Sequence, residues 1–322
     1  MNSETERLLL AQGSVVAARQ LSAQGISSKE QRQLIVSGDL LALRKSIYTT
    51  GNLWHLADAR TRHRVAVAGA LLIRRRVEAD RLPLSLVGGH ESAEFVWGLS
   101  DRAIPPDNIH LVCSERRRRT DRSGVVLRPA ALPAAHVTRV ESVPFTSLGR
   151  TAVDLMRRRS ARDAVLLADR TLRAGVSRTE LRQIAAFCSS WRGGTQAVEA
   201  AEFASPLAES PAESLARWTC HRLGLPTPEP QVQILDARGF VGRVDLLFGD
   251  FRTILEVDGR LKYGRPTEGM DDVLWHEKLR EDRLRDAGYE VVRTTWRELL
   301  MEPDRLHQRI LAAFARSNRL AS

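Results

Sequence analysis

The sequence has few of the residues that build several common kinds of site. Its 322 residues include only three cysteines, Cys113, Cys188 and Cys220, which are isolated from one another. Isolated cysteines exclude a disulfide framework and a Cys-x-x-Cys zinc site. Lysine is also rare, with four residues, although lysine and arginine together number 49. The positive charge therefore comes mainly from arginine, which stays charged and cannot act as a base.

Long apolar runs and a signal-peptide pattern are missing as well. The longest apolar run, residues 65–73, is too short to span a bilayer. The sequence begins polar and acidic, unlike a signal peptide. We therefore expect a cytoplasmic protein without a membrane partner. The formal net charge of +10 suits a polyanionic partner, although solvated arginine-rich helix faces are the alternative explanation.

Two strand-like runs near the C-terminal end carry acidic residues. Asp245 lies in residues 241–248, and Glu256 and Asp258 lie in residues 253–259. Between the runs, Gly249-Asp250 suits a two-residue hairpin turn of type II′. That turn pairs Phe248 with Phe251, Val244 with Leu255, and Asp245 with Ile254. Since side chains alternate along a strand, one face holds Val244, Leu246, Leu255 and Val257, and the other holds Asp245, Glu256 and Asp258.

This register makes Asp245 and Glu256 diagonal cross-strand neighbours, roughly 7–8 Å apart at the backbone. Two carboxylates so close repel each other unless a cation lies between them. Mg²⁺ and Mn²⁺ prefer oxygen ligands, so we expect Asp245, Glu256 and Asp258 to hold such an ion. An exposed strand acid without a function is the alternative, but aspartate is depleted in strands.

From about residue 205 to the end, the order of motifs resembles the PD-(D/E)xK nuclease core, and more closely the very-short-patch-repair-like endonuclease domains of bacteria. The matching elements are Glu213 on a first helix, Asp245, Glu256-Val257-Asp258-Gly259, a charged helix around Glu277, and a strand after Gly288-Tyr289. The resemblance implies catalytic roles for these acids, with Glu213 and Glu277 in support. The parent motif has lysine where this sequence has Asp258, which leaves the catalytic amine to Lys262 or Lys278.

Structural interpretations of these supporting residues stay open. Ser210-Pro211-Ala212-Glu213 is a capping box with proline at the first helical position, so Glu213 needs no catalytic role. Lys262 suits a solvated loop, and Lys278 can pair with Asp282 on its helix.

The first 50 residues indicate a DNA-binding fold. Helices are expected over residues 5–12, from Ser14 onward, and from the capping box Ser27-Ser28-Lys29-Glu30 to Gly38, followed by a β-ribbon over residues 40–48. This order predicts a winged helix-turn-helix, whose third helix enters the major groove. Lys29, Arg32 and Gln33 would face DNA, with Arg44 and Lys45 on the wing. A winged helix used only for protein contacts is the alternative.

The same stretch resembles the N-terminal domain of AbiEi-type antitoxins. The resemblance rests on Arg44-Lys45-Ser46-Ile47-Tyr48, and continues at Pro144-Phe145-Thr146-Ser147 and at Arg150-Thr151-Ala152-Val153-Asp154-Leu155. It implies a cognate toxin as a partner. In between, we expect a helix over residues 62–77 and strands over 84–87, 108–113 and 124–128. A further helix is expected over residues 161–172.

These patterns together predict a multi-domain α/β protein. Its expected parts are a winged helix over residues 1–50, an α/β middle domain over 51–175, linker helices over 176–204 and an endonuclease-like domain over 205–322. The expected function is metal-dependent hydrolysis of double-stranded DNA in phage defence or DNA repair. The alternative is a non-enzymatic, antitoxin-like transcriptional regulator with an inactive nuclease fold, and a homodimer is also open.

Overall fold

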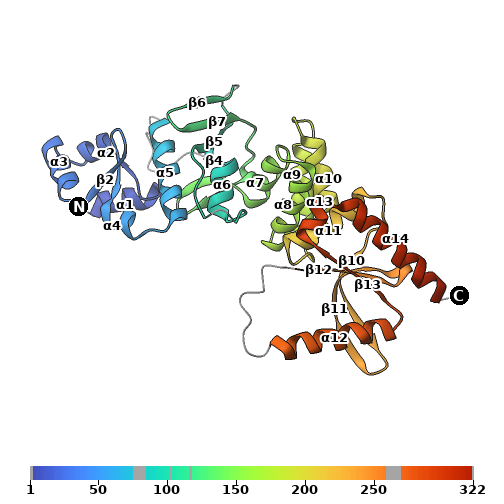
Figure 1. Ribbon diagram of the computed structural model, residues 1–322. Helices are drawn as coiled ribbons and strands as arrows, with labels where there is room; N and C mark the ends of the chain where they lie inside the picture. Colours follow the sequence, from blue (N-terminus) through green and yellow to red (C-terminus); the bar gives the residue numbers. More distant parts are fainter. Residues whose placement is uncertain (1–2, 75–84, 102, 116–117, 259–269, 321–322) are drawn as a thin grey trace. The chain divides into compact units, whose positions relative to one another are not determined.

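The computed structural model describes residues 3–74, 85–101, 103–115, 118–258 and 270–320. The protein is mixed α/β, and the chain divides into two compact units (Figure 1). The first unit comprises Met1–Arg158 and Val176–Val198, and the second comprises Arg159–Gly175 and Glu199–Ser322. None of the helices in the described part of the chain combines the length and apolar character needed to cross a bilayer.

The first unit begins with three helices and a small antiparallel sheet. These elements are α1 (Ser3–Ala11), β1 (Val16–Ala17), α2 (Ala18–Ala23), α3 (Ser28–Val36), β2 (Leu40–Arg44) and β3 (Ile47–Thr50), with strand order β1-β3-β2. The predicted capping box is confirmed, because Ser27 and Glu30 exchange backbone-to-side-chain hydrogen bonds at the start of α3. The helix expected from Ser14 begins only at Ala18, because Val16 and Ala17 pair with β3 instead.

The rest of the first unit packs helices against a six-stranded mixed sheet of order β6-β7-β5-β4-β9-β8. Its strands are β4 (Leu86–Gly88), β5 (Ile109–Cys113), β6 (Thr120–Arg122), β7 (Val125–Pro129), β8 (Val137–Val140) and β9 (Val143–Thr146). Its helices are α4 (Gly51–Leu56), α5 (Ala59–Arg74), α6 (His90–Trp97), α7 (Leu148–Met156) and α9 (Arg178–Phe187), with the short η1 (Ala134–His136) before β8. The three predicted strands are confirmed as β4, β5 and β7. The sequence analysis predicted neither the strands β6, β8 and β9 nor the helices α4 and α6.

The Arg150–Asp154 motif is part of the core of the first unit. Arg150 is fully buried and donates from Nε to Asp154 Oδ2 at 2.9 Å, and Arg157 reaches the other oxygen of Asp154 at 3.2 Å. The indole of Trp191 lies 4.9 Å from each guanidinium. The motif residues therefore stabilise the fold by supplying partners to charges that water does not reach.

The second unit contains a four-stranded sheet of order β10-β11-β12-β13. Its strands are β10 (Glu229–Asp236), β11 (Gly239–Phe248), β12 (Thr253–Asp258) and β13 (Glu290–Thr295). Its helices are α8 (Ala161–Arg173), α11 (Pro211–Arg222), α12 (Met270–Asp286), α13 (Trp296–Met301) and α14 (Pro303–Leu320), while α10 (Gly194–Phe203) extends across the division between the units. β12 and β13 run parallel, which requires a crossover, and α12 lies in that crossover.

Two apolar clusters surround this sheet. Leu246, Phe248, Leu255 and Val292 pack with residues of α11, α13 and α14, whereas Leu247 and Ile254 pack with Leu284 of α12. The predicted apolar face is therefore correct for Leu246 and Leu255. It is wrong for Val244, which belongs to the cluster on the α12 side.

The predicted hairpin turn at Gly249-Asp250 is wrong. The connection has four residues, in which η2 (Gly249–Phe251) is followed by Arg252 in the left-handed region at φ 40°. The observed pairs are Leu246 with Leu255 and Phe248 with Thr253, so the register differs by two residues from the expected one. A shift by two preserves which side chains share a face, whereas a shift by one would exchange the faces.

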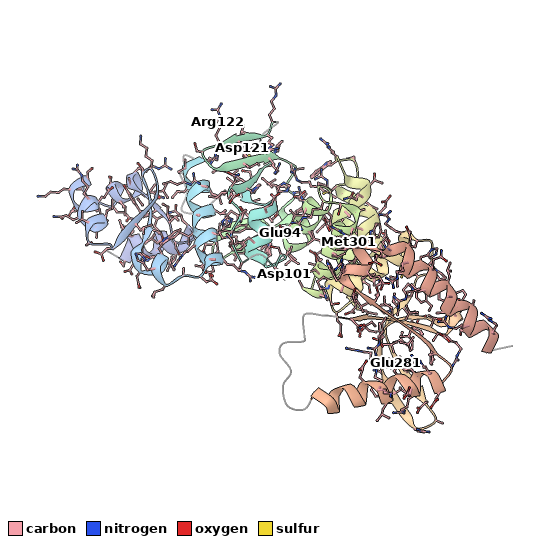
Figure 2. The ribbon with its side chains drawn as sticks, in the orientation of Figure 1. Glu94, Asp101, Asp121, Arg122, Glu281 and Met301 are labelled. Atoms are coloured by element: carbon pink, nitrogen blue, oxygen red, sulfur yellow. The ribbon has the colours of Figure 1, made fainter. Side chains whose placement is uncertain are left out.

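Replacing Asp154 with alanine should destabilise the first unit by about 3–5 kcal/mol, because Arg150 would be left buried without a charge partner. Chemical denaturation followed by tryptophan fluorescence would measure the loss. Asp121→Ala is the control, because Asp121 is an exposed residue of β6 whose contact with Arg119 is 3.7 Å long (Figure 2). It should change stability by less than about 1 kcal/mol. Equal effects of the two substitutions would contradict the buried-pair explanation.

Candidate functional site

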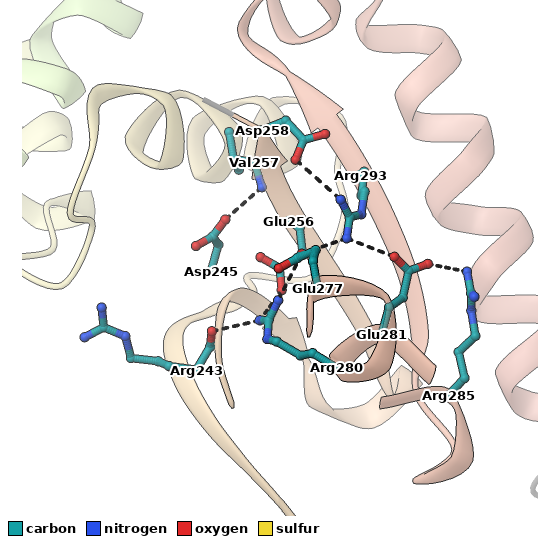
Figure 3. Close-up of polar contacts among 10 residues, drawn as sticks. All are labelled: Arg243, Asp245, Glu256, Val257, Asp258, Glu277, Arg280, Glu281, Arg285 and Arg293. Atoms are coloured by element: carbon teal, nitrogen blue, oxygen red, sulfur yellow. Dashed lines mark hydrogen bonds and ion pairs between the residues drawn. The ribbon is translucent and has the colours of Figure 1, made fainter. Parts of the chain in front are cut away.

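A line of polar side chains crosses all four strands of the second unit's sheet. Glu256 of β12 pairs with Arg293 of β13. One step beyond the pair Leu246–Leu255, the same register sets Asp245 of β11 opposite Glu256. On the other side of Asp245, Gln231 lies between the pairs Pro230–Leu246 and Val232–Val244. We refer to Gln231, Asp245, Glu256 and Arg293 as the polar row, of which the last three are drawn in Figure 3.

Asp245 takes part in the backbone pattern of the sheet. The ladder between β11 and β12 ends at Leu246–Leu255, and Asp245 Oδ2 then accepts a hydrogen bond of 2.8 Å from the Val257 amide. A carboxylate oxygen thus substitutes for a ladder carbonyl. This contact explains how an aspartate is accommodated between the buried Val244 and Leu246. It also brings Asp245 directly opposite Glu256, rather than into the diagonal position predicted from the two-residue turn.

Glu256 is partly buried and has an unusual charge environment. Its side chain is 13% exposed and accepts a 2.8 Å bond from Nη2 of Arg280, a residue of α12. Burial and the neighbouring charge of Asp245 raise the pKa of Glu256 to about 7, although Arg280 opposes this shift. Glu256 therefore exchanges its proton close to neutral pH, where an ordinary glutamate is fully ionised.

The remaining acids form a network with two other arginines (Figure 3). Arg293 donates to Glu277 at 2.8 Å and to Glu281 at 2.9 Å, and it lies 3.9 Å from Asp258. Glu281 also pairs with Arg285. The side chain of Arg243, in contrast, bonds to Glu209.

Glu213 is connected to the polar row through Gln231. Its Oε2 accepts 2.8 Å bonds from the Glu209 amide and from Nε2 of Gln231. Ser210 caps the start of α11 and Pro211 opens it, as the sequence predicts. In the predicted capping box, the Ser210 amide would donate to the Glu213 side chain. Here the Glu209 amide donates to it instead. Glu213 therefore contacts both the start of α11 and Gln231 of the polar row. These contacts agree with a capping role and with a supporting role at the candidate site.

The two candidate lysines do not supply an amine to the acids in the described part of the structure. Lys262 lies outside the described residues. Lys278 is exposed on α12, and no ion pair joins it to Asp282 or to another described residue. The cation in contact with Glu256 is Arg280. Sequence reasoning missed Arg280 because it searched for a lysine, and the helical spacing from Glu277 was the available signal.

The residues expected to face DNA form one side of α3. Lys29, Arg32, Gln33 and Val36 are exposed at the spacing of one helical face, and with Ser37 they line a surface depression. The sequence reading missed Val36, which is 89% exposed and apolar. Between β2 and β3, Lys45 is exposed beside Ser46, which has φ 61°. Arg44 is half-buried and donates to the Ser123 carbonyl at 3.0 Å, so its guanidinium already has a protein partner.

Asp245 and Glu256 are the candidate ligands for a metal ion. Among the described residues, no group of three or more His, Cys, Asp or Glu side chains is arranged to hold a metal ion. Mg²⁺, however, commonly uses one or two carboxylates and takes its other ligands from water and substrate phosphates. The opposed Asp245 and Glu256 provide that smaller donor set, with oxygen atoms of the right chemistry.

Comparison with known proteins does not identify a function for these residues. No protein-family model and no curated protein matches the chain.

The raised pKa of Glu256 predicts a pH-dependent stability in metal-free buffer. Because the folded state holds this proton more tightly, the contribution of Glu256 is complete below about pH 4.5, the ordinary pKa, and is lost as the pH rises to about 7. Compared with the wild type, Glu256→Gln should show a smaller loss of unfolding free energy across this window. Denaturant titrations at several pH values, with a chelator present, would measure it.

Glu290→Gln is a suitable control, since Glu290 pairs with Arg316 and not with a second acid. A wild-type profile parallel to that of Glu256→Gln across the window would rule out the Asp245–Glu256 repulsion.

Proposed function

We propose that the second unit is a divalent-metal-dependent endonuclease domain of the PD-(D/E)xK type that hydrolyses phosphodiester bonds in DNA. The observation that carries the proposal is the opposition of Asp245 and Glu256 on neighbouring strands, inside a polar row that crosses the sheet. Two carboxylates in this arrangement repel each other without a cation. Because this repulsion destabilises the metal-free protein, it favours a role for the two acids in binding a cation.

The individual residues have distinct parts in this proposal. Asp245 and Glu256 would hold Mg²⁺ or Mn²⁺, with Asp258 at the exposed end of the same strand. When bound, the ion supplies Lewis-acid polarisation of the phosphate and lowers the pKa of a water molecule. Asp245 is oriented by the Val257 amide, and Arg293 orients Glu277. Gln231 donates to Glu213 and so links it to the polar row.

We further propose that the N-terminal helices and ribbon are a winged helix that binds double-stranded DNA. Supporting observations are the order α1-β1-α2-α3-β2-β3 and the exposed α3 face with Lys29, Arg32 and Gln33. In this arrangement α3 enters the major groove, where Val36 can contact thymine methyl groups. Lys45 contacts phosphate from the wing, whereas Arg44 stabilises the wing through Ser123.

A non-enzymatic regulator is the second candidate function, and one observation favours it. Arg280 neutralises Glu256 directly, and none of the described lysines contacts the acids. A partly buried ion pair of this kind can be purely structural. The regulator would resemble an antitoxin of the AbiEi type and retain the nuclease-like fold for holding DNA or for dimerisation, with a toxin as its partner.

Asp245→Asn distinguishes the two functions. For an endonuclease, the substitution should abolish Mg²⁺-dependent nicking of a plasmid while leaving the metal-free protein as stable as the wild type, because it relieves like-charge repulsion. Mg²⁺ should raise the melting temperature of the wild type more than that of the variant. A nicking assay and melting curves with and without Mg²⁺ or Mn²⁺ provide both readouts.

Asp250→Asn is the matched control, because Asp250 is an exposed acid in the turn that follows β11. Its nicking and its response to Mg²⁺ should equal those of the wild type. A wild-type protein that neither nicks DNA nor gains stability from either ion would instead support the regulator.

The α3 surface predicts a defined salt dependence of DNA binding. Each phosphate contact contributes about 0.9 to the slope of log affinity against log salt concentration. The double variant Lys29→Ala, Arg32→Ala should therefore bind duplex DNA more weakly, with a slope reduced by up to about 1.8 if both residues contact phosphate. Arg305→Ala removes an exposed charge from α14 and should leave affinity unchanged. Fluorescence anisotropy at several salt concentrations would measure these slopes, and an unchanged affinity in the double variant would remove α3 from the interface.

A further inference from the structure

Arg280 makes more contacts with the candidate site than any lysine of the described chain. Its Nη2 donates to Glu256 at 2.8 Å and to the Arg243 carbonyl at 3.0 Å, and its Nη1 lies 3.5 Å from Glu277. These partners come from β12, β11 and α12. The guanidinium is therefore held from three sides, with one edge on the carboxylate that would bind a metal ion (Figure 3).

The backbone of β11 provides space for this arginine. A Cβ atom at Gly242 would lie 2.6 Å from Nε of Arg280 and 3.3 Å from its Cδ. The glycine is thus needed because the arginine stem crosses directly over the strand. A side chain at residue 242 would therefore require Arg280 to move, because the three nearest atoms all belong to that residue.

We propose that Arg280 is the resident cation of the acid pair: it neutralises Glu256 when no divalent ion is bound, and it transfers to a DNA phosphate when the ion takes the carboxylate. This inference rests on the proposed endonuclease function. It assigns to Arg280 the electrostatic part of the lysine that the motif lacks. Because a guanidinium stays charged at neutral pH, Arg280 can stabilise a phosphate but cannot accept a proton from water.

The geometry supports an exchange rather than a permanent ion pair. The side chain of Arg280 is 24% exposed, so it can turn toward solvent without crossing the core. When a divalent ion neutralises Asp245 and Glu256, the attraction that holds the guanidinium decreases. Arginine binds phosphate through parallel N–H donors, so a DNA phosphate beside the ion is a suitable new partner.

Metal affinity is the decisive measurement, because it does not depend on turnover. If Arg280 competes with the ion, Arg280→Ala should bind Mn²⁺ about tenfold more tightly than the wild type, since the ion no longer replaces a charge-assisted hydrogen bond. At saturating Mn²⁺ the same variant should nick plasmid about a hundredfold more slowly, as expected for loss of a transition-state contact. Calorimetric titration of the full-length protein with Mn²⁺ would provide the affinity.

Gly242→Ala tests the same idea without removing a charge. The added methyl group should displace Arg280, so this variant should also bind Mn²⁺ more tightly and cleave more slowly. Circular dichroism of both variants would establish that they are folded. If Arg280→Ala fails to fold without metal, Gly242→Ala alone decides the question.

Arg283→Ala is the matched control on the same helix. Arg283 likewise contacts a carboxylate, Asp236, at 2.8 Å and a carbonyl of β11, that of Phe240, at 3.4 Å. Because Asp236 is not part of the polar row, this variant should leave Mn²⁺ affinity unchanged.

The outcomes separate this inference from the proposed function. Unchanged or weaker Mn²⁺ binding in Gly242→Ala and in folded Arg280→Ala overturns the competition. A wild-type protein that binds no Mn²⁺ overturns both the competition and the endonuclease. Tighter binding in the variants, with no nicking by the wild type, retains the competition and overturns the endonuclease.

Discussion

The pairing of Leu246 with Leu255 across β11 and β12 determines where Asp245 and Glu256 lie. Both leucines are buried among residues of α11, α13 and α14, so the register cannot slip without exposing them. With this pair in place, the next residues outward along the two strands are Asp245 and Glu256. The burial of two leucines therefore holds two like charges near each other. The hydrogen bond from the Val257 amide to Asp245 completes the arrangement.

The nearness of Asp245 to Glu256 was predictable from the sequence, whereas the detailed geometry was not. Regular alternation was the basis for assigning Asp245, Glu256 and Asp258 to one face. It fails between Val244 and Leu246, which belong to clusters on different sides of the sheet. The turn length depends on the left-handed conformation of Arg252, which is fixed by distant contacts: Arg252 donates to the Gly288 carbonyl, and its own carbonyl accepts from the Glu290 amide. Such contacts leave no local signal. The two-residue shift that resulted moved Glu256 from a diagonal to a direct position.

The functional contacts missed from the sequence are long-range for the same reason. Arg280 reaches Glu256 across the crossover between β12 and β13, and the need for Gly242 becomes evident only when the two are seen together. Arg44 was assigned to DNA because it is basic and lies in a predicted wing. Its bond to Ser123, 79 residues away, depends on how β2 packs beside the six-stranded sheet. By contrast, the α3 face was identified in advance, because helical spacing alone brings Lys29, Arg32 and Gln33 together.

The charge of the site opposes the charge of the chain, and this contrast has a consequence for the proposed function. A net charge of +10 attracts DNA at long range, but the neighbouring acids Asp245 and Glu256 repel phosphate at short range. A scissile phosphate can approach Asp245 and Glu256 only when a cation offsets them. Arg280 is already paired with Glu256. Its positive charge alone therefore cannot also neutralise a phosphate. A divalent ion would both neutralise the acids and release the guanidinium. Metal binding and phosphate binding should therefore be mutually dependent at this site, although DNA binding by α3 should not depend on either.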